Sequence, residues 1–168
     1  GGKEIGKTKI DLEGLDTDAE RIIKAYLENP KIILPIDVVI GESINNKKEE
    51  TAIVSIDEIP EDKKVLDIGP ESIKNYNIII KQAKTIVWNG PLGYIENEVF
   101  AEATKKVAEA IVETTHHHDA KSIIGGGDGV SAAHKFGYAD KITFISSGGG
   151  ASLKLFEGKE LIALKILE

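Results

Sequence analysis

Three consecutive glycines followed by an aspartate form the part of this sequence best suited to chemistry. A short β-branched run ends at Gly125–Gly127, and Asp128 then precedes a segment with a helical pattern, Val130 to Phe136. Glycines let backbone N–H groups approach a ligand closely and permit positive φ angles. The N-terminus of the following helix directs its unpaired N–H groups toward the same place. This junction favours a phosphate site at which Asp128 holds a divalent cation on the phosphate.

The residues alone leave three other interpretations of this junction open. In the first, Asp128 is the N-cap of a helix that follows an ordinary tight loop. Gly127–Ala132 also fits the dinucleotide pattern G-x-G-x-x-A, but that motif needs an acidic residue about 20 positions later. Phe144–Gly148, which occupies that place, contains none. The run Gly126–Gly129 is also similar to the nucleotide loop of lipid and NAD kinases.

The composition is that of a globular protein and argues against several classes of function. The 168 residues suffice for one domain with a full core, and 41% are hydrophobic and 29% charged. A net charge of −7 without a basic run gives no indication of nucleic acid or anionic membrane as a partner. The absence of cysteine excludes disulfides and thiolate chemistry.

No run approaches the roughly 20 apolar residues of a membrane span, so we expect a cytoplasmic protein. The sequence contains no methionine and begins with Gly1 and Gly2. We therefore expect a fragment of a longer chain, or a chain whose natural start has been altered.

Short apolar segments alternate with helical patterns along the chain. The expected strands are Lys31–Leu34, Thr85–Trp88, Ser122–Ile124 and Lys141–Ile145. The expected helices are Ala19–Leu27 after a cap at Asp16 or Thr17, Glu71–Gln82, Asn97–Glu113, Val130–Phe136 and Ala151–Phe156. This alternation predicts an α/β fold with a doubly wound, Rossmann-like parallel sheet and helices on both faces. Asp37–Ile40 and Thr51–Ser55 indicate a β-hairpin excursion near residues 37–56.

Three successive strands of this predicted sheet end in glycine-rich turns. The turns are Asn89-Gly90-Pro91, Gly125–Asp128 and Ser146–Gly150. Parallel sheets bind ligands beyond the carboxyl ends of their strands. The shared position of the turns therefore predicts one ligand site at that edge.

Four motifs resemble, in this order, those of the phosphoglycerate kinase family. They are Val65–Ser72, Val87–Gly93, Ile124–Asp128 and Gly148–Leu153, with flanking matches at Glu4–Lys7, Leu34–Asp37 and Leu155–Leu161. The resemblance implies that residues 1–168 are a partial C-terminal, nucleotide-binding domain. The 3-phosphoglycerate domain would be missing, as would the first strand–helix units with their phosphate-binding lysines. The implied reaction is reversible phosphoryl transfer between 1,3-bisphosphoglycerate and ADP in glycolysis, with Mg²⁺ as cofactor. An alternative is a non-catalytic nucleotide-binding module or an isolated fragment without turnover.

The same resemblance implies roles for individual residues. Leu66 and Pro91 would enclose the adenine, Asn89 would contact the phosphates, and Glu96 would accept hydrogen bonds from the ribose hydroxyls. Asp128 would hold Mg²⁺ on the nucleotide. The phosphoryl group in transfer would meet Gly126, Gly127 and Gly149, and the nucleotide would also meet Gly125, Gly148 and Gly150. The sequence departs from the family pattern at Gly129, where the family usually has Ser or Thr.

The remaining polar and aromatic residues favour structural roles. Trp88 is expected in the core, and Asp37 and Asp67 are expected to cap turns. His116–His118 are expected at a solvated helix end rather than at a metal. The expected order of the later strands is Thr85–Trp88, Ser122–Ile124, Thr143–Ile145. We then expect Ile32–Leu34 to pair with Ile86–Trp88, or the segment to associate with another copy or a complementing fragment, since unpaired apolar strand edges invite association.

Overall fold

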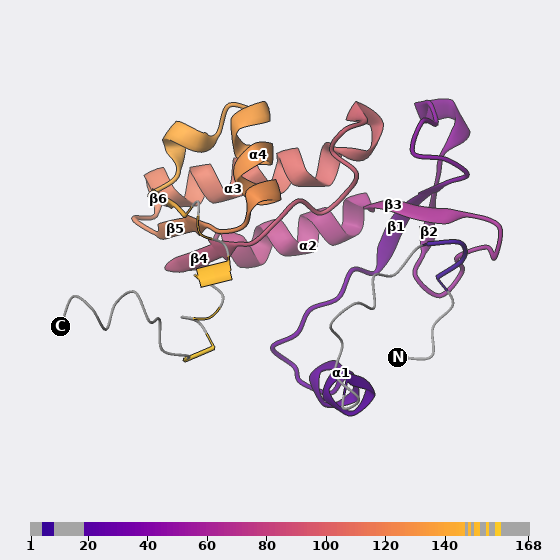
Figure 1. Ribbon diagram of the computed structural model, residues 1–168, viewed down its shortest axis with the longest axis horizontal. Coiled ribbons are helices and arrows are strands. Elements are labelled where there is room, and N and C mark those ends of the chain that lie inside the picture. Colours follow the sequence, from indigo (N-terminus) through magenta and orange to yellow (C-terminus); the bar gives the residue numbers. More distant parts are fainter. Residues whose placement is uncertain are drawn as a thin grey trace.

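The computed structural model describes residues 5–8, 19–146, 148, 150, 151, 154, 157 and 158, with residues 19 and 20 as backbone only. In chain order the elements are α1 (Ala19–Leu27), β1 (Asp37–Gly41), η1 (Lys48–Glu50), β2 (Ala52–Ser55), β3 (Lys64–Ile68), α2 (Pro70–Ile80), β4 (Thr85–Trp88), η2 (Glu98–Phe100), α3 (Glu102–His117), β5 (Lys121–Ile124), α4 (Gly127–Lys135), η3 (Ala139–Lys141) and β6 (Phe144–Ile145). Figure 1 shows their arrangement around two small sheets. None of these helices has both the length and the apolar character that crossing a bilayer requires.

One of the two sheets is parallel and has the strand order β4-β5-β6. Trp88 pairs with Ile124, and Ile124 pairs with Ile145 on the other side. The predicted α/β fold with a parallel sheet is confirmed, and so is the predicted order of these three strands. Helices α3 and α4 occupy the two connections between them, as parallel pairing requires.

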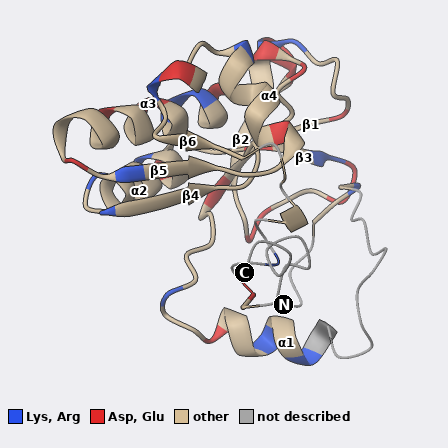
Figure 2. Cartoon of the chain, turned by 60° about the vertical axis from the view of Figure 1, so that its left-hand side comes forward, with Lys and Arg blue, Asp and Glu red and all other residues tan. Residues whose placement is uncertain are grey.

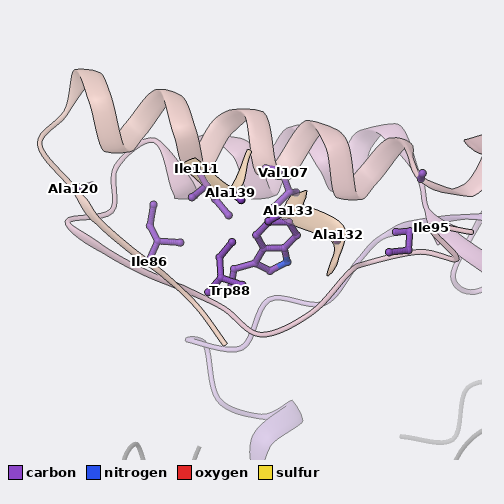
Figure 3. Close-up of a cluster of buried hydrophobic side chains, with 12 residues drawn as sticks. Ile86, Trp88, Ile95, Val107, Ile111, Ala120, Ala132, Ala133 and Ala139 are labelled. Atoms are coloured by element: carbon purple, nitrogen blue, oxygen red, sulfur yellow. The ribbon is translucent and has the colours of Figure 1, made fainter. Parts of the chain in front are cut away.

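The core lies between this sheet and helices α3 and α4. Ile86 and Trp88 of β4 point toward α3, as Figure 3 shows. Val107, Ala108 and Ile111 of α3 and Ala132 and Ala133 of α4 belong to the same buried cluster. The alternation along β4 explains the arrangement, because residues two apart in a strand share one face of the sheet. Trp88 is a core residue, as predicted.

The opposite face of the parallel sheet is uncovered in the described part of the chain. Val87 is 44% exposed and Phe144 is 59% exposed, and Val87 and Phe144 both lie in register with Ile123 between them. Helices were expected on both faces, but α3 and α4 share one face. Crossover connections have one hand, so strands that advance in a single direction place their helices on the same side. Helices on the second face require a reversal of strand order.

The other sheet is antiparallel and has the strand order β2-β1-β3. β1 and β2 pair from Asp37 with Ser55 to Ile40 with Ala52, which makes a hairpin of the segment near residues 37–56. β3 adds to the other edge of β1, with a register irregularity between Val39 and Ile40.

The strand expected at Lys31–Leu34 is wrong. These residues form no strand, and Ile33 is 49% exposed. The segment crosses α2 instead, where Ile33 and Tyr76 line one shallow pocket and the Tyr76 hydroxyl donates to the Ile33 carbonyl at 3.1 Å. Direct pairing with β4 is therefore also wrong, because the segment lies against a helix rather than a strand edge. The expected caps Asp16 and Thr17 lie outside the described residues, as does most of the expected helix Ala151–Phe156.

Two carboxylates join the antiparallel sheet to the helices. Asp37 of β1 accepts the backbone N–H groups of Glu71 and Ser72 at 3.0 and 2.8 Å, and so caps the first turn of α2. A Cβ on Gly69 would lie 2.3 Å from this carboxylate, so the contact depends on glycine. Partial burial raises the pKa of Asp37, but hydrogen bonds from the Ser72 hydroxyl and from these N–H groups outweigh it and lower the pKa overall.

The second of these carboxylates is Asp67 of β3, which is only 2% exposed. Its Oδ2 accepts the N–H of Ala103 in the first turn of α3 at 3.1 Å, and its Oδ1 accepts the N–H of Ile68 at 2.9 Å. Burial raises the pKa of Asp67 to about 6; the two N–H bonds oppose the rise, and the charge of Glu102 adds to it. Asp37 and Asp67 therefore both bond to helix termini.

We predict that Asp67→Asn changes how stability depends on pH. The folded-state pKa of Asp67 is raised, so its favourable contribution is present below the unfolded value of 3.8 and is lost as pH rises through about 6. Asparagine does not titrate. The unfolding free energy of the wild type minus that of the variant should therefore fall by up to roughly 3 kcal/mol between pH 4 and pH 7. Urea unfolding at several pH values measures it, with the exposed Asp140→Asn as control. A difference that stays constant with pH would contradict the prediction.

Candidate functional site

The carboxyl ends of β4, β5 and β6 lie at one level. The hydrogen-bond ladder continues past the strands, because Gly125 N–H donates to the Trp88 carbonyl at 2.9 Å and Ser146 N–H donates to the Ile124 carbonyl at 2.8 Å. Asn89, Gly125 and Ser146 therefore begin their turns side by side. The structure brings together the three strand ends that carry the glycine-rich turns.

Gly126 shapes the central turn. It has a φ of 80° and a ψ of 143°, and it occupies the N-cap position of α4. Its carbonyl accepts the N–H of Val130 at 3.1 Å. A Cβ on Gly126 would lie 3.2 Å from the carbonyl oxygen of Asn89, whereas a Cβ on Gly127 would meet nothing within 4 Å. Gly126 is thus required by backbone conformation and by close approach, while Gly127 leaves open space above the helix N-terminus.

Asp128 is the second residue of α4 and is exposed. The interpretation of Asp128 as an ordinary N-cap is wrong, because Gly126 holds that position and no side chain caps this helix. A carboxylate in the first turn is favoured by the helix dipole. Asp128 therefore projects from the same helix end that directs N–H groups at the turn.

Gly129 packs α4 against the turn that follows β4. A Cβ at this position would lie 3.3 Å from the nitrogen of Gly90 and 3.2 Å from Cγ2 of Ile124. A serine or threonine here would require the neighbouring atoms to give by a few tenths of an ångström. Gly129, where the sequence departs from the family pattern, thus lies at a close contact between the start of α4 and the turn after β4.

The loop of residues 89–97 is fixed at several points. The Trp88 indole N–H donates to the Gly90 carbonyl, and Thr104 Oγ1 accepts the N–H of Leu92 at 3.1 Å. Farther along, the Leu66 carbonyl accepts the N–H of Tyr94 at 2.9 Å, and Lys135 Nζ donates to the Ile95 carbonyl. Sequence reasoning missed Thr104, Tyr94 and Lys135. The only signal was a polar Thr104 on the apolar face of α3.

The residues predicted to bind nucleotide fall into two groups. Asn89 is exposed and lies beside Gly125 and Gly126, with its Oδ1 3.4 Å from where a Cβ of either would be. Leu66 lies near the far end of the loop, where its carbonyl accepts the N–H of Tyr94, and Glu96 follows Tyr94 by two residues. Leu66 is buried, with its Cδ1 3.1 Å from a Cβ built on Gly41, and Glu96 is exposed. Pro91 is half-buried between the groups. Gly148 and Gly150 are exposed, and Gly149 lies outside the described residues.

One cavity of about 350 Å³ lies elsewhere, between the hairpin and the first turns of α2 and α3. It is lined by Val39, Lys48, Thr51, Ile53, Ile68, Pro70, Ile73, Glu98, Val99 and Glu102. None of the predicted site residues contributes to it. The strand ends are better suited to a phosphate than this cavity, because they combine a glycine-rich backbone, a helix N-terminus and an exposed carboxylate.

The described residues contain no cluster of three or more acidic or histidine side chains that could cage a metal. His116–His118 are exposed at the end of α3. Mg²⁺ commonly binds through one or two carboxylates together with water and substrate phosphates. The single exposed carboxylate of Asp128 fits an ion that arrives with a phosphate ligand.

A family model described as "Phosphoglycerate kinase" matches residues 1–159. The chain belongs to the phosphoglycerate kinase family. Among curated relatives with this name, it is 44% identical over 167 residues to that of Desulfosudis oleivorans and 41% identical over 167 residues to that of Borreliella afzelii. Each alignment covers 99% of this chain but 41% of the relative. The chain thus spans well under half the length of these family members.

Solved structures of the family have the same fold. The phosphoglycerate kinase of Coxiella burnetii matches with a TM-score of 0.83 at 36% identity, covering 99% of this chain and 41% of that one. The enzyme of Pyrococcus horikoshii matches with a TM-score of 0.70 at 33% identity, covering 88% and 34%. These matches confirm the resemblance recognised in the four motifs.

The adjacent glycines of the central turn should respond differently to a methyl group. Gly126→Ala forces an alanine to a φ of 80° and brings its Cβ close to the Asn89 carbonyl, so it should destabilise the fold by about 1–2 kcal/mol. Gly127→Ala is the matched control. It meets open space within a helix and should be neutral or slightly stabilising. Urea unfolding of both variants tests this, and equal effects would argue against the turn geometry described here.

Proposed function

We propose that this chain supplies most of the nucleotide site of a phosphoglycerate kinase, as part of its C-terminal domain. The observation that carries the proposal is the alignment of three glycine-rich strand ends beside the N-terminus of α4. The reaction is reversible transfer of a phosphoryl group from the acyl phosphate of 1,3-bisphosphoglycerate to ADP. The bond between phosphorus and the carboxyl oxygen breaks, a bond to the β-phosphate oxygen of ADP forms, and 3-phosphoglycerate and ATP leave.

The strand ends suit the moving phosphoryl group. Such transfer needs positioning and neutralisation of charge more than covalent chemistry. Backbone N–H groups of Gly126 and Gly127 would hold the group in transfer, joined by Gly149 from the next turn. Asp128 would hold Mg²⁺, which neutralises phosphate charge when bound. Gly125, Gly148 and Gly150 would keep the backbone close to the phosphates.

The loop of residues 89–97 suits the rest of the nucleotide. Asn89 would contact the phosphates, because it lies beside the glycine turn. Pro91 and Leu66 would supply apolar surface for the adenine. Glu96 is exposed at the far end of the loop, where its carboxylate would accept hydrogen bonds from the ribose hydroxyls.

The chain spans 41% of its relatives' length, so we propose that a phosphoglycerate-binding domain elsewhere in the complete enzyme supplies the acyl phosphate. On family membership alone we place the reaction in the cytoplasm. The same coverage favours a second candidate, a nucleotide-binding module without turnover of its own.

Asp128→Ala should abolish the magnesium dependence of nucleotide binding. Calorimetric titration of the wild type with ADP should show weak binding that tightens several-fold when Mg²⁺ is added, because the Asp128 carboxylate would hold the ion that accompanies the phosphates. The variant should bind ADP equally with and without Mg²⁺. Asp140→Ala, another exposed acid, is the control. If magnesium dependence survives in Asp128→Ala, this carboxylate is not the ligand.

The 168-residue chain alone should form no ATP from 1,3-bisphosphoglycerate and ADP above background. A phosphorylated acid requires a cluster of basic groups, whereas Arg21 is the sole arginine of the sequence. Lys and Arg residues are scattered among Asp and Glu residues over the described part of the chain (Figure 2). A coupled assay for ATP measures this, with a complete family member as positive control. Substantial turnover by the chain alone would contradict the proposal that another domain supplies the acyl phosphate.

A further inference from the structure

The side chain of Asn97 connects two segments that lie far apart in the sequence. Its Nδ2 donates to the carbonyls of Ile44 and Asn46 at 2.8 and 3.0 Å, and its Oδ1 accepts the N–H of Val99 at 3.0 Å. Both amide hydrogens and one oxygen lone pair are therefore used. One side chain thus connects the loop of residues 89–97 to the turn after β1, about 50 residues away in sequence.

The turn that accepts hydrogen bonds from Asn97 is closed by hydrogen bonds of its own. Asn46 Oδ1 accepts the N–H of Ser43 at 2.7 Å, and the Asn46 N–H donates to the Ser43 carbonyl at 3.1 Å. Asn97 therefore bonds to a turn that has hydrogen bonds of its own, at the carbonyls of Ile44 and Asn46.

Glu96 lies between two anchored neighbours. Ile95 is buried and its carbonyl accepts Lys135 Nζ, while Asn97 is clamped to the turn and its N–H donates to the Tyr94 carbonyl at 3.2 Å. Glu96 itself is exposed. The backbone on both sides of Glu96 is anchored, so the point from which its side chain leaves the loop is fixed.

We propose that Asn97 is a positioning residue that orients Glu96 toward the ribose hydroxyls of the nucleotide, an inference that rests on the function proposed above. Asn97 does not touch the nucleotide. It acts by holding the end of the loop against the turn of residues 43–46. A charge-assisted hydrogen bond is lost or weakened when its carboxylate is displaced by as little as an ångström.

The test compares Mg-ADP with Mg-2′,3′-dideoxy-ADP, which lacks the ribose hydroxyls, by NMR titration of the chain. The wild type should bind ADP about tenfold more tightly, the value of one such hydrogen bond. Asn97→Asp keeps the acceptor for Val99 but turns a carboxylate toward two carbonyls. It should bring the ratio of affinities close to one while leaving the affinity for dideoxy-ADP within about twofold.

Further variants test whether Asn97 acts through Glu96. Asn45→Ala, an exposed amide in the same turn, should keep the wild-type ratio. In a Glu96→Ala background the ratio should already be close to one, and adding Asn97→Asp should change it no further, because both residues act through one contact. Asn97→Ser, which retains an acceptor for Val99, replaces Asn97→Asp if circular dichroism shows that the latter is unfolded.

Each outcome separates the two hypotheses. If the wild type binds neither nucleotide, the proposed function fails and this inference fails with it. If the wild type prefers ADP and Asn97→Asp retains that preference, or weakens both nucleotides equally, the inference alone is overturned and Asn97 only stabilises the loop.

Discussion

The buried carboxylate of Asp67 is the contact on which the two sheets depend for their relative placement. It accepts the N–H of Ala103 at the start of α3 from within β3, so the antiparallel sheet is fixed to the helix that covers the parallel sheet. A Cβ on Gly93 would lie 2.3 Å from the same carboxylate, so the loop after β4 also closes directly over it. β3, α3 and the loop after β4 therefore meet at Asp67. Burial of a carboxylate is costly, but the N-terminus of α3 partly compensates its charge.

Much of the fold followed from local patterns. A helix was expected over Asn97–Glu113 from Val107 and Ile111 at helical spacing, and α3 spans Glu102–His117. β4 and β5 were expected from β-branched runs that stop at glycine-rich turns. The edge where Asn89 and Gly125 meet followed from a general rule, since parallel strands share one carboxyl end. These inferences succeeded because the determining residues are neighbours in sequence.

Features set by distant partners could not be read in the same way. Lys31–Leu34 has the composition of a buried strand, yet a strand also requires a neighbouring edge, and the segment instead lies against Tyr76 of α2. Asn97 resembled an ordinary helix start, and nothing local indicated that its amide reaches Ile44. Leu66 was assigned from a family motif, and only coordinates could show that its side chain is buried against Gly41.

The register of the parallel sheet also constrains the order in which this chain can fold. Thr85 pairs with Lys121, so the first contact between β4 and β5 must enclose all of α3 within one closed loop. No tight turn can nucleate that pairing, and loop closure costs entropy before any strand bond repays it. A preformed α3 shortens the distance that the loop must span. Docking of Val107 and Ile111 onto Ile86 and Trp88 would thus precede or accompany strand pairing, and the glycine turn at the strand ends would be among the last parts to take shape.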